Sequence, residues 1–337
     1  MRVATFHGLD RPITIEQIDD PRPGPDEILI RVHRCGLCGS DIAMTSGGPA
    51  SLPLGRFGHE WAGEVVEVGR NVEHLRVGAR IAALPVPRCG RCEECRTTAN
   101  PLFCENASYL VGGFGEYMVV PPIVAVPLPQ SLSYADGALV EPMSCGLHAL
   151  TLAQMHEGDL ILVIGAGAMA LSVVYWARTL NAGKIVVLSR SPHRNDTAMV
   201  MGADAVLSFS HEDKPRVAEA LGGPPAIVAE CVGKEGMLDL ATQHVRPRGT
   251  VVSLGMCMHG DSLVPALCTS KEMKLLFPKG YTVAEFERTA RAFDAGRVQP
   301  EIMVSDTIAL EALPQMLNDI HGGTRKSHKV QVDPTLA

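Results

Sequence analysis

A cysteine, a histidine and nearby carboxylates stand early in this chain at a spacing that could hold a metal ion. Cys38 precedes the run Gly58-His59-Glu60-Trp61-Ala62-Gly63, which Gly69 and Val72 follow. Thiolate, imidazole and carboxylate are ligands that zinc takes, and a catalytic zinc keeps three protein ligands and one open position. The regularly placed glycines predict a tightly turning β-structure around them. If Cys38 and His59 bind zinc, the site polarises an oxygen and a third ligand lies elsewhere.

Four further cysteines lie close together in the sequence. Cys89-x-x-Cys92-x-x-Cys95 is followed, after eight intervening residues, by Cys104. Four thiolates at this spacing suit a closed tetrahedral zinc site, which is structural because no coordination position stays open. An iron–sulfur cluster and reduced cysteines without metal are the competing interpretations. The acidic pair Glu93-Glu94 inside the loop disfavours a zinc ribbon that binds nucleic acid.

Length and charge limit the class of protein further. A chain of 337 residues is long for one hydrophobic core, so we expect two domains. The formal net charge of −7 argues against a nucleic-acid partner. No signal segment is evident at residues 1–8, and ten cysteines then indicate the reducing cytoplasm. The apolar stretch 160–177 contains two glycines in a turn pattern, which favours a strand, turn and helix over a membrane span.

The pattern of the chain changes near residue 159. Before it, short β-type runs such as 28–32 and 64–68 alternate with Pro/Gly clusters, which is typical of a β-rich domain. After it, apolar strands alternate with helical segments. We expect strands at 160–164, 184–188, 226–230 and 250–254, and helices at 169–180 and around 198–201. This alternation predicts an α/β fold with a doubly wound parallel sheet.

A glycine-rich loop follows the first of these strands. Gly165-x-Gly167-x-x-Ala170 lies between a buried strand and a helix. The two glycines allow a sharp turn and close approach to a pyrophosphate, and a small third residue allows close helix–strand packing. The motif alone often marks only a tight turn, but in this setting it predicts a dinucleotide site.

The end of the next strand bears on which dinucleotide is bound. An acidic residue about 20 positions on would bind the ribose 2′-hydroxyl. The sequence has Ser189 and Arg190 there, with Arg194 shortly after. Ser189 can donate a hydrogen bond to a 2′-phosphate and the arginines can pair with it, which favours NADP over NAD. The alternative is that both arginines are solvated surface charges.

The run from Gly58 to Val72 resembles the signature of zinc-containing alcohol dehydrogenases, Gly-His-Glu-x2-Gly-x5-Gly-x2-Val, without a mismatch. The four-cysteine loop and the nucleotide motif follow in the order that this family shows. Over essentially its whole length the chain is similar to zinc-dependent members of the medium-chain dehydrogenase/reductase superfamily. Within it, the resemblance is to the polyol (sorbitol dehydrogenase-like) and bacterial secondary-alcohol branches.

The resemblance implies roles for single residues. Cys38 and His59 match two ligands of the catalytic zinc, and Glu60 a carboxylate that can approach or exchange onto the metal. Glu141, in Val140-Glu141-Pro142, matches the glutamate ligand of polyol dehydrogenases. Asp41 matches the carboxylate that orients the ligand histidine, as such partners do at metal sites.

Two positions depart from the family pattern. Ala43 stands where a relay histidine is often found, so a proton accepted by Ser40 would pass to water, another group or the ribose. The stretch between Cys95 and Cys104 is one residue longer than usual, which we expect the loop to absorb.

The resemblance also implies fold, activity and assembly. A GroES-like β-rich catalytic domain, residues 1–144 and 282–337, would enclose a Rossmann dinucleotide-binding domain, residues 145–281. The activity would be reversible hydride transfer between an alcohol and NADP(H), with zinc as Lewis acid and Ser40 as proton acceptor. A homotetramer, or a dimer, is expected, with residues 274–277 near an interface. The alternatives are an NAD-dependent threonine- or formaldehyde-dehydrogenase-like enzyme, a zinc-free reductase, and a zinc- and nucleotide-binding redox sensor.

Overall fold

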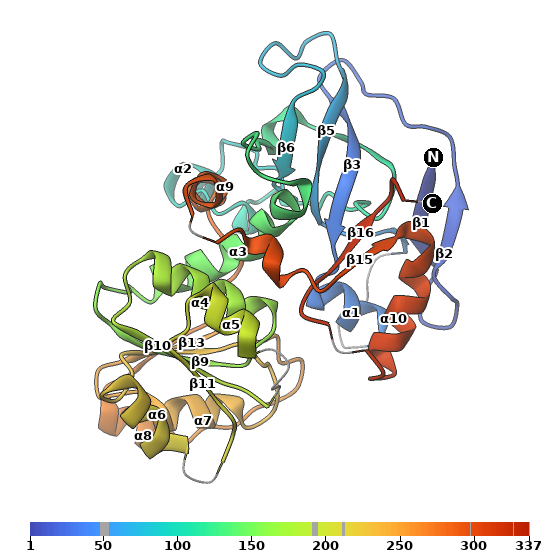
Figure 1. Cartoon of the computed structure of the whole chain (residues 1–337). Coiled ribbons are helices and arrows are strands. Elements are labelled where there is room, and N and C mark those ends of the chain that lie inside the picture. Colours follow the sequence, from blue (N-terminus) through green and yellow to red (C-terminus); the bar gives the residue numbers. More distant parts are fainter. Residues whose placement is uncertain (48–53, 191–194, 211–212, 297, 326, 337) are drawn as a thin grey trace. The chain divides into compact units, whose positions relative to one another are not determined.

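The chain divides into two compact units. The computed structural model describes residues 1–47, 54–190, 195–210, 213–296, 298–325 and 327–336. Residues 1–141 and 281–337 form the first unit, and residues 142–280 the second. The chain leaves the first unit within helix α3 (Tyr134–Leu152) and returns to it at Tyr281, so the second unit is inserted between two segments of the first (Figure 1).

The second unit is built on a parallel sheet with the strand order β11-β10-β9-β12-β13-β14. The chain starts at the central strand β9, moves outward to β11, then returns to the other side of β9 and moves outward to β14. This is the doubly wound order in which ligands bind where the direction reverses, and it confirms the predicted α/β fold. The strands are β9 (Leu160–Ile164), β10 (Lys184–Leu188), β11 (Ala205–Leu207), β12 (Ile227–Glu230), β13 (Thr250–Ser253) and β14 (Lys274–Leu276).

Helices cover both faces of this sheet. Figure 1 shows α4 (Ala168–Thr179) and α5 (Asn195–Met201) on one face, and α6 (Asp213–Leu221), α7 (Met237–His244) and α8 (Pro265–Lys271) on the other. On the face covered by α6 and α7, strand and helix side chains form a buried apolar cluster that includes Leu162, Val186, Val217 and Val245. The apolar stretch 160–177 forms β9 and most of α4. In the described part of the chain, no helix is long and apolar enough to cross a bilayer.

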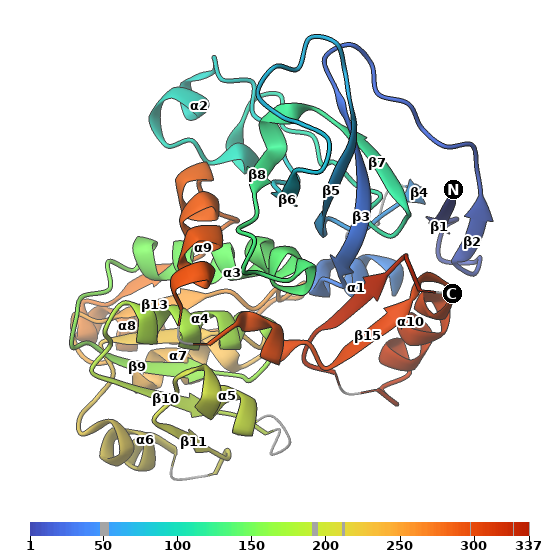
Figure 2. The ribbon, with the colours of Figure 1, turned by 45° about the horizontal axis from the view of Figure 1, so that its top comes forward.

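The first unit is strand-rich. Its larger sheet has the order β15-β16-β3-β5-β6-β8, with β7 paired to β3, and a smaller sheet has the order β2-β1-β4 (Figure 2). The C-terminal strand β16 pairs with the central strand β3, so the last residues return to the middle of the sheet. The strands are β1 (Arg2–Phe6), β2 (Thr14–Gln17), β3 (Ile28–Gly36), β4 (Gly55–Arg56), β5 (Glu60–Val68), β6 (Arg80–Ala83), β7 (Tyr117–Val120), β8 (Ala125–Pro127), β15 (Asp306–Ala309) and β16 (Val330–Asp333). Its other helices are α1 (Gly39–Thr45), α2 (Glu93–Thr97), α9 (Val283–Ala295) and α10 (Leu313–His321).

The glycines of the 58–72 run, which predict a tightly turning β-structure, serve both a turn and a strand. Gly58 has a φ of 90°, as a turn residue would. Gly63, however, lies inside strand β5, where a Cβ atom would stand 2.1 Å from the carbonyl oxygen of Arg31. A side chain there would therefore push β5 away from β3. The glycine serves close strand pairing, which fixes the register of the two strands that carry the site.

Candidate metal and cofactor sites

The ends of two paired strands bring Cys38 and His59 together. In the antiparallel pairing of β3 with β5, Gly36 lies opposite Glu60. Residues just after β3 and just before β5 therefore meet at the same edge of the sheet. Ligand atoms of Cys38, His59 and Glu60 all lie within 4.8 Å of one another. One thiol, one imidazole and one carboxylate at this separation form the mixed donor set of a catalytic zinc site.

Asp41, on the first turn of helix α1, contacts both Cys38 and His59. It is 1% exposed; its Oδ2 accepts the N–H of Cys38 at 3.0 Å, and its Oδ1 lies 3.6 Å from Nδ1 of His59. Burial lowers the pKa of His59, but the Cys38 thiolate and the Asp41 carboxylate outweigh it and raise that pKa well above its ordinary value. The negative groups around His59 therefore favour a positive charge at this place. Ser40, half-buried, lies on the same turn, with Ala43 one turn later.

Glu60 is buried against a lysine from the far end of the chain. The Nζ atom of Lys329 forms an ion pair with Oε2 of Glu60 and donates to the carbonyl oxygen of Leu37 at 3.1 Å. Both side chains are almost fully buried, and Gly36 leaves the room: a Cβ atom there would lie 2.9 Å from Cε of Lys329. Burial lowers the pKa of Lys329, but the Glu60 carboxylate outweighs it, so the lysine stays charged.

The second carboxylate oxygen of Glu60 supports a metal at this place. Among the described residues, no donor hydrogen-bonds to its buried Oε1 atom. A buried carboxylate oxygen without a partner is costly, and native structures supply such atoms with a donor, a water or a cation. The residues present therefore fit a zinc ion held by Cys38, His59 and a carboxylate.

Glu141 lies beside this group rather than within it. The Tyr281 hydroxyl donates to Oε1 of Glu141 at 2.9 Å, and Glu141 interacts electrostatically with His59 and Glu60. Desolvation raises the pKa of Glu141 to about 7. The structure thus places two carboxylates near the thiol and the imidazole, and gives the closer position to Glu60. The resemblance to polyol dehydrogenases implies Glu141 as the third ligand.

The four predicted cysteines of the loop come together in the first unit. Their sulfur atoms lie within 4.8 Å of one another, with 4.0 Å between Cys89 and Cys95 and 3.9 Å between Cys92 and Cys104. Four thiolates at the usual Zn–S distance of about 2.3 Å stand roughly 3.8 Å apart in a tetrahedron. The backbone N–H groups of Arg91 and Cys92 lower the pKa of Cys89 to about 6, whereas desolvation raises the pKa of Cys95 to about 12, so the spacing of the sulfur atoms carries the assignment. This cluster fits a closed zinc site.

The extra residue in this loop is absorbed locally. Helix α2 begins just after Cys92 and ends at Thr97, and a 3₁₀ turn at Pro101–Phe103 leads into Cys104. The side chain of Asn100 caps that turn by accepting the N–H of Leu102 at 3.1 Å. Cys104 therefore reaches the other sulfurs despite the longer connection.

The glycine-rich loop of the second unit lines a cavity of about 210 Å³ at the C-terminal ends of the strands. Gly165 has a φ of 111° and follows β9, Gly167 is the N-cap of α4, and Ala170 is fully buried on that helix. Backbone N–H groups at a helix N-terminus suit a phosphate. The lining residues are Gly165, Ala166, Gly167, Ser189, Arg190, Phe209, Cys231, Val232 and Met237.

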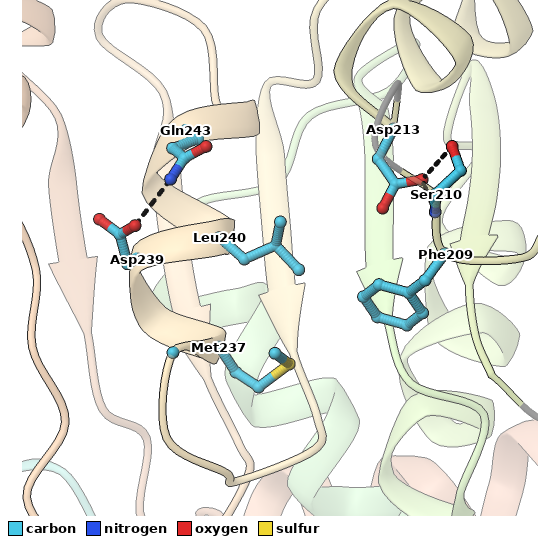
Figure 3. A pocket seen from close by; sticks show the side chains of 8 residues that line it. Phe209, Ser210, Asp213, Met237, Asp239, Leu240 and Gln243 are labelled. Atoms are coloured by element: carbon cyan, nitrogen blue, oxygen red, sulfur yellow. Dashed lines mark hydrogen bonds between the residues drawn. The ribbon is translucent and has the colours of Figure 1, made fainter.

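The predicted residues for the 2′-position of the ribose lie in part in this cavity. Ser189 is 5% exposed and donates its backbone N–H to Leu207 at 2.9 Å, and Arg190 is exposed. No carboxylate of the described residues lines the cavity. Arg194 lies outside the described residues. A larger cavity of about 520 Å³ shares Phe209 and Met237 with the first and extends along α7 (Figure 3).

Comparisons with known proteins agree with both units. Residues 24–130 match the model of the alcohol dehydrogenase GroES-like domain, and residues 168–295 that of the zinc-binding dehydrogenases. Sorbitol dehydrogenase of Bacillus subtilis (strain 168) is 33% identical over 267 residues, 76% of this chain and 75% of that protein. The chain belongs to the zinc-dependent alcohol dehydrogenases of the medium-chain superfamily. It is an oxidoreductase that acts on CH–OH groups.

Two further relatives span more of this dehydrogenase. (R,R)-butanediol dehydrogenase of Bacillus subtilis (strain 168) is 31% identical over 294 residues, 83% of this chain and 85% of that protein. A zinc-binding dehydrogenase of Sinorhizobium meliloti 1021, solved with NADP, has a TM-score of 0.88 at 28% identity over 99% of both chains.

Sequence reasoning missed two residues beside the candidate metal site of this dehydrogenase. Lys329 precedes β16 and Tyr281 precedes α9, both far along the chain from Cys38. Neither belongs to a motif, and a single lysine near the C-terminus has no local signal of burial. Only the return of the C-terminal segment to strand β3 brings Lys329 to Glu60.

Proposed function

We propose that this dehydrogenase interconverts a polyol or secondary alcohol and the corresponding ketone, with NADP(H) as hydride carrier. The observation that carries the proposal is the cluster of Cys38, His59 and Glu60, in which one buried carboxylate oxygen has no donor among the described residues. Two relatives whose names specify sorbitol and a butanediol support an alcohol with more than one hydroxyl group.

The residues of the first unit have separate roles in this proposal. Cys38, His59 and a carboxylate, Glu60 or Glu141, would hold the catalytic zinc, which when bound supplies a Lewis acid that lowers the pKa of the substrate hydroxyl. Asp41 orients His59 through Nδ1. Ser40, on the same helical turn, would accept the hydroxyl proton. The four-cysteine cluster would hold a structural zinc and take no part in the reaction.

The preference for NADP rests on the end of strand β10. Ser189 and Arg190 line the cavity, and a cation together with a hydroxyl suits a phosphate better than a ribose hydroxyl. Arg194 would add a second cation. The 2′-phosphate would also meet no carboxylate among the described lining residues.

Assembly and location complete the proposal. Strand β14 is the edge of the parallel sheet, and Phe277, which follows it, is 63% exposed. An edge strand beside an exposed aromatic residue is a surface for pairing with another copy, so we propose a homo-oligomer. We propose a tetramer, because the chain length resembles that of the tetrameric bacterial members of the family. We also propose a cytoplasmic location, because reducing surroundings keep the cysteine thiols available as zinc ligands.

A panel of alcohols and ketones, assayed with NADP and with NAD, tests the function. Polyols and secondary alcohols should be oxidised faster than primary alcohols, threonine or formaldehyde adducts. Faster turnover of threonine or a formaldehyde adduct would overturn the substrate class. Equal or better turnover with NAD would overturn the cofactor preference alone.

A pair of matched variants sharpens the cofactor argument. Arg190→Ala removes one exposed charge from the cavity. Arg248→Ala removes one that pairs with Glu272 at the N-terminal ends of strands β13 and β14. Loss of a charge-assisted hydrogen bond should raise the KM for NADP about tenfold in the first variant and leave the KM for NAD unchanged. The Arg248 variant should change neither value.

A further inference from the structure

A carboxylate that belongs to no motif lies buried at the C-terminal end of strand β12. Glu230 is 1% exposed. Its Oε1 accepts the backbone N–H groups of Val232 at 2.6 Å and Gly233 at 2.8 Å, and its Oε2 accepts the hydroxyl of Ser253 at 3.1 Å. Both carboxylate oxygens thus accept hydrogen bonds, and these charge-assisted bonds fix the positions of Val232, Gly233 and Ser253.

These bonds join the connections that follow two neighbouring strands. Val232 and Gly233 follow β12, and Ser253 ends β13. The carbonyl oxygen of Glu230 also accepts the N–H groups of Leu254 at 2.7 Å and Gly255 at 3.0 Å. The two connections touch: a Cβ atom on Gly255 would lie 2.6 Å from Oε2 of Glu230 and 2.1 Å from the nitrogen of Gly233. Glu230 is therefore the centre around which both connections fold.

The connection after β12 is also a wall of the cofactor cavity. Cys231 and Val232 line that cavity together with the glycine-rich loop. A Cβ atom on Gly165 would lie 3.1 Å from Cγ2 of Val232, so the Val232 side chain sets the space beside the turn. The N–H group of the same Val232 is bonded to the buried carboxylate. Movement of this connection by even an ångström would change the width of the cavity.

We propose that Glu230 is a positioning residue for the dinucleotide, which acts through Val232 to hold the cavity wall at the distance that the cofactor needs. The inference rests on the proposed dinucleotide-dependent function and adds a residue to it. In open α/β sheets the ligand lies outside the carboxyl ends of the strands, and Glu230 braces two of those ends at once.

Direct titration of the full-length protein with NADPH, and separately with NADH, followed by nucleotide fluorescence, tests the proposal without a substrate. Glu230→Ala should raise the dissociation constant about tenfold or more, because small displacements in such sites have large effects. Glu230→Gln should stay within about threefold of the wild type. Its amide oxygen can accept the two N–H groups while its amide nitrogen donates to the Ser253 hydroxyl. In turnover, Glu230→Ala should raise the cofactor KM and leave kcat at saturating cofactor nearly unchanged.

A matched control separates positioning from stability. Asp204 lies just before β11, at the N-terminal end of the strands. Its Oδ2 accepts the N–H of Ile185 at 2.7 Å. Asp204→Ala should lower the melting temperature but not change the dissociation constant. If Glu230→Ala lowers only the melting temperature too, the proposal is overturned. If that variant does not fold, Glu230→Asp replaces it, because the shorter side chain keeps the charge but loses reach. An unchanged dissociation constant in Glu230→Asp would then overturn the proposal. A wild type that binds neither nucleotide would instead overturn the proposed function.

Discussion

The two groups of metal-ligating residues in the first unit are built in opposite ways. The four cysteines of residues 89–104 come from one short stretch and offer one kind of atom. The group at Cys38 draws on the end of strand β3, the start of strand β5, helix α3 and the C-terminal segment, and offers sulfur, nitrogen and oxygen. It also holds more carboxylates than three ligand positions require, each with its own partner: Lys329 for Glu60 and Tyr281 for Glu141.

The difference shows how a closed site and an open site are specified. A closed site needs only enough sulfur atoms in a short loop, because each fills one position and none has to move. An open site has to leave a position for substrate, so its last ligand must be held in place by other residues. Glu60 has a charged partner and Glu141 a neutral one, so we expect the two carboxylates to contribute unequally to metal binding.

Replacement of each carboxylate in turn should have the largest effect. Glu60→Gln should lower kcat/KM roughly 1,000-fold and release metal from this site, since outer partners alone are worth about 10- to 100-fold. Glu141→Gln should retain the metal and lose less activity. Elemental analysis with steady-state kinetics measures both. Metal loss in Glu141→Gln but not in Glu60→Gln would show that Glu141 is the third ligand, as the sequence had favoured.

Removal of the lysine beside Glu60 should have an intermediate effect. Lys329→Met keeps most of the side-chain volume but frees the Glu60 carboxylate, and we expect metal affinity and kcat/KM to fall about 10- to 100-fold. Competition with a chelator measures the affinity. Lys271→Met serves as the control, because Lys271 donates to three carbonyl oxygens within the second unit. Equal metal affinity in both variants would show that Lys329 does not support metal binding.

The cysteine cluster should show the smallest effect on activity. Cys104→Ser should release metal from the cluster and lower the melting temperature by roughly 5–10 °C, given about 2–4 °C per kcal/mol in domains of this size. At 25 °C kcat/KM should stay within about threefold of the wild type, because no coordination position of this site is open. A loss of activity as large as that of Glu60→Gln would mean that the two sites do not differ in role.

Strongly patterned elements could be predicted from the sequence. The strand at 160–164 and the one at 184–188 have the bounds that their apolar runs indicated, because buried parallel strands are continuous apolar segments. The glycines of the 58–72 run predict a tightly turning β-structure, in which Gly58 has a turn conformation and Gly63 lies in strand β5. Glycine marks both turns and close strand contacts, and the pattern alone does not separate them.

The sequence by itself determined which chemistry is available. It supplied the thiols, the imidazole, the glycine loop and the family signature, since a residue type carries its own donor atoms wherever it lies. The tertiary structure decided which of these atoms meet. It gave the position nearest Cys38 and His59 to Glu60, buried Lys329 against it, and set Glu230 behind the cofactor cavity. The contacts of Cys38 with Glu60, of Glu60 with Lys329 and of Glu230 with Ser253 join residues that are far apart in the chain. Their distances follow from strand pairing and burial, which no local pattern encodes.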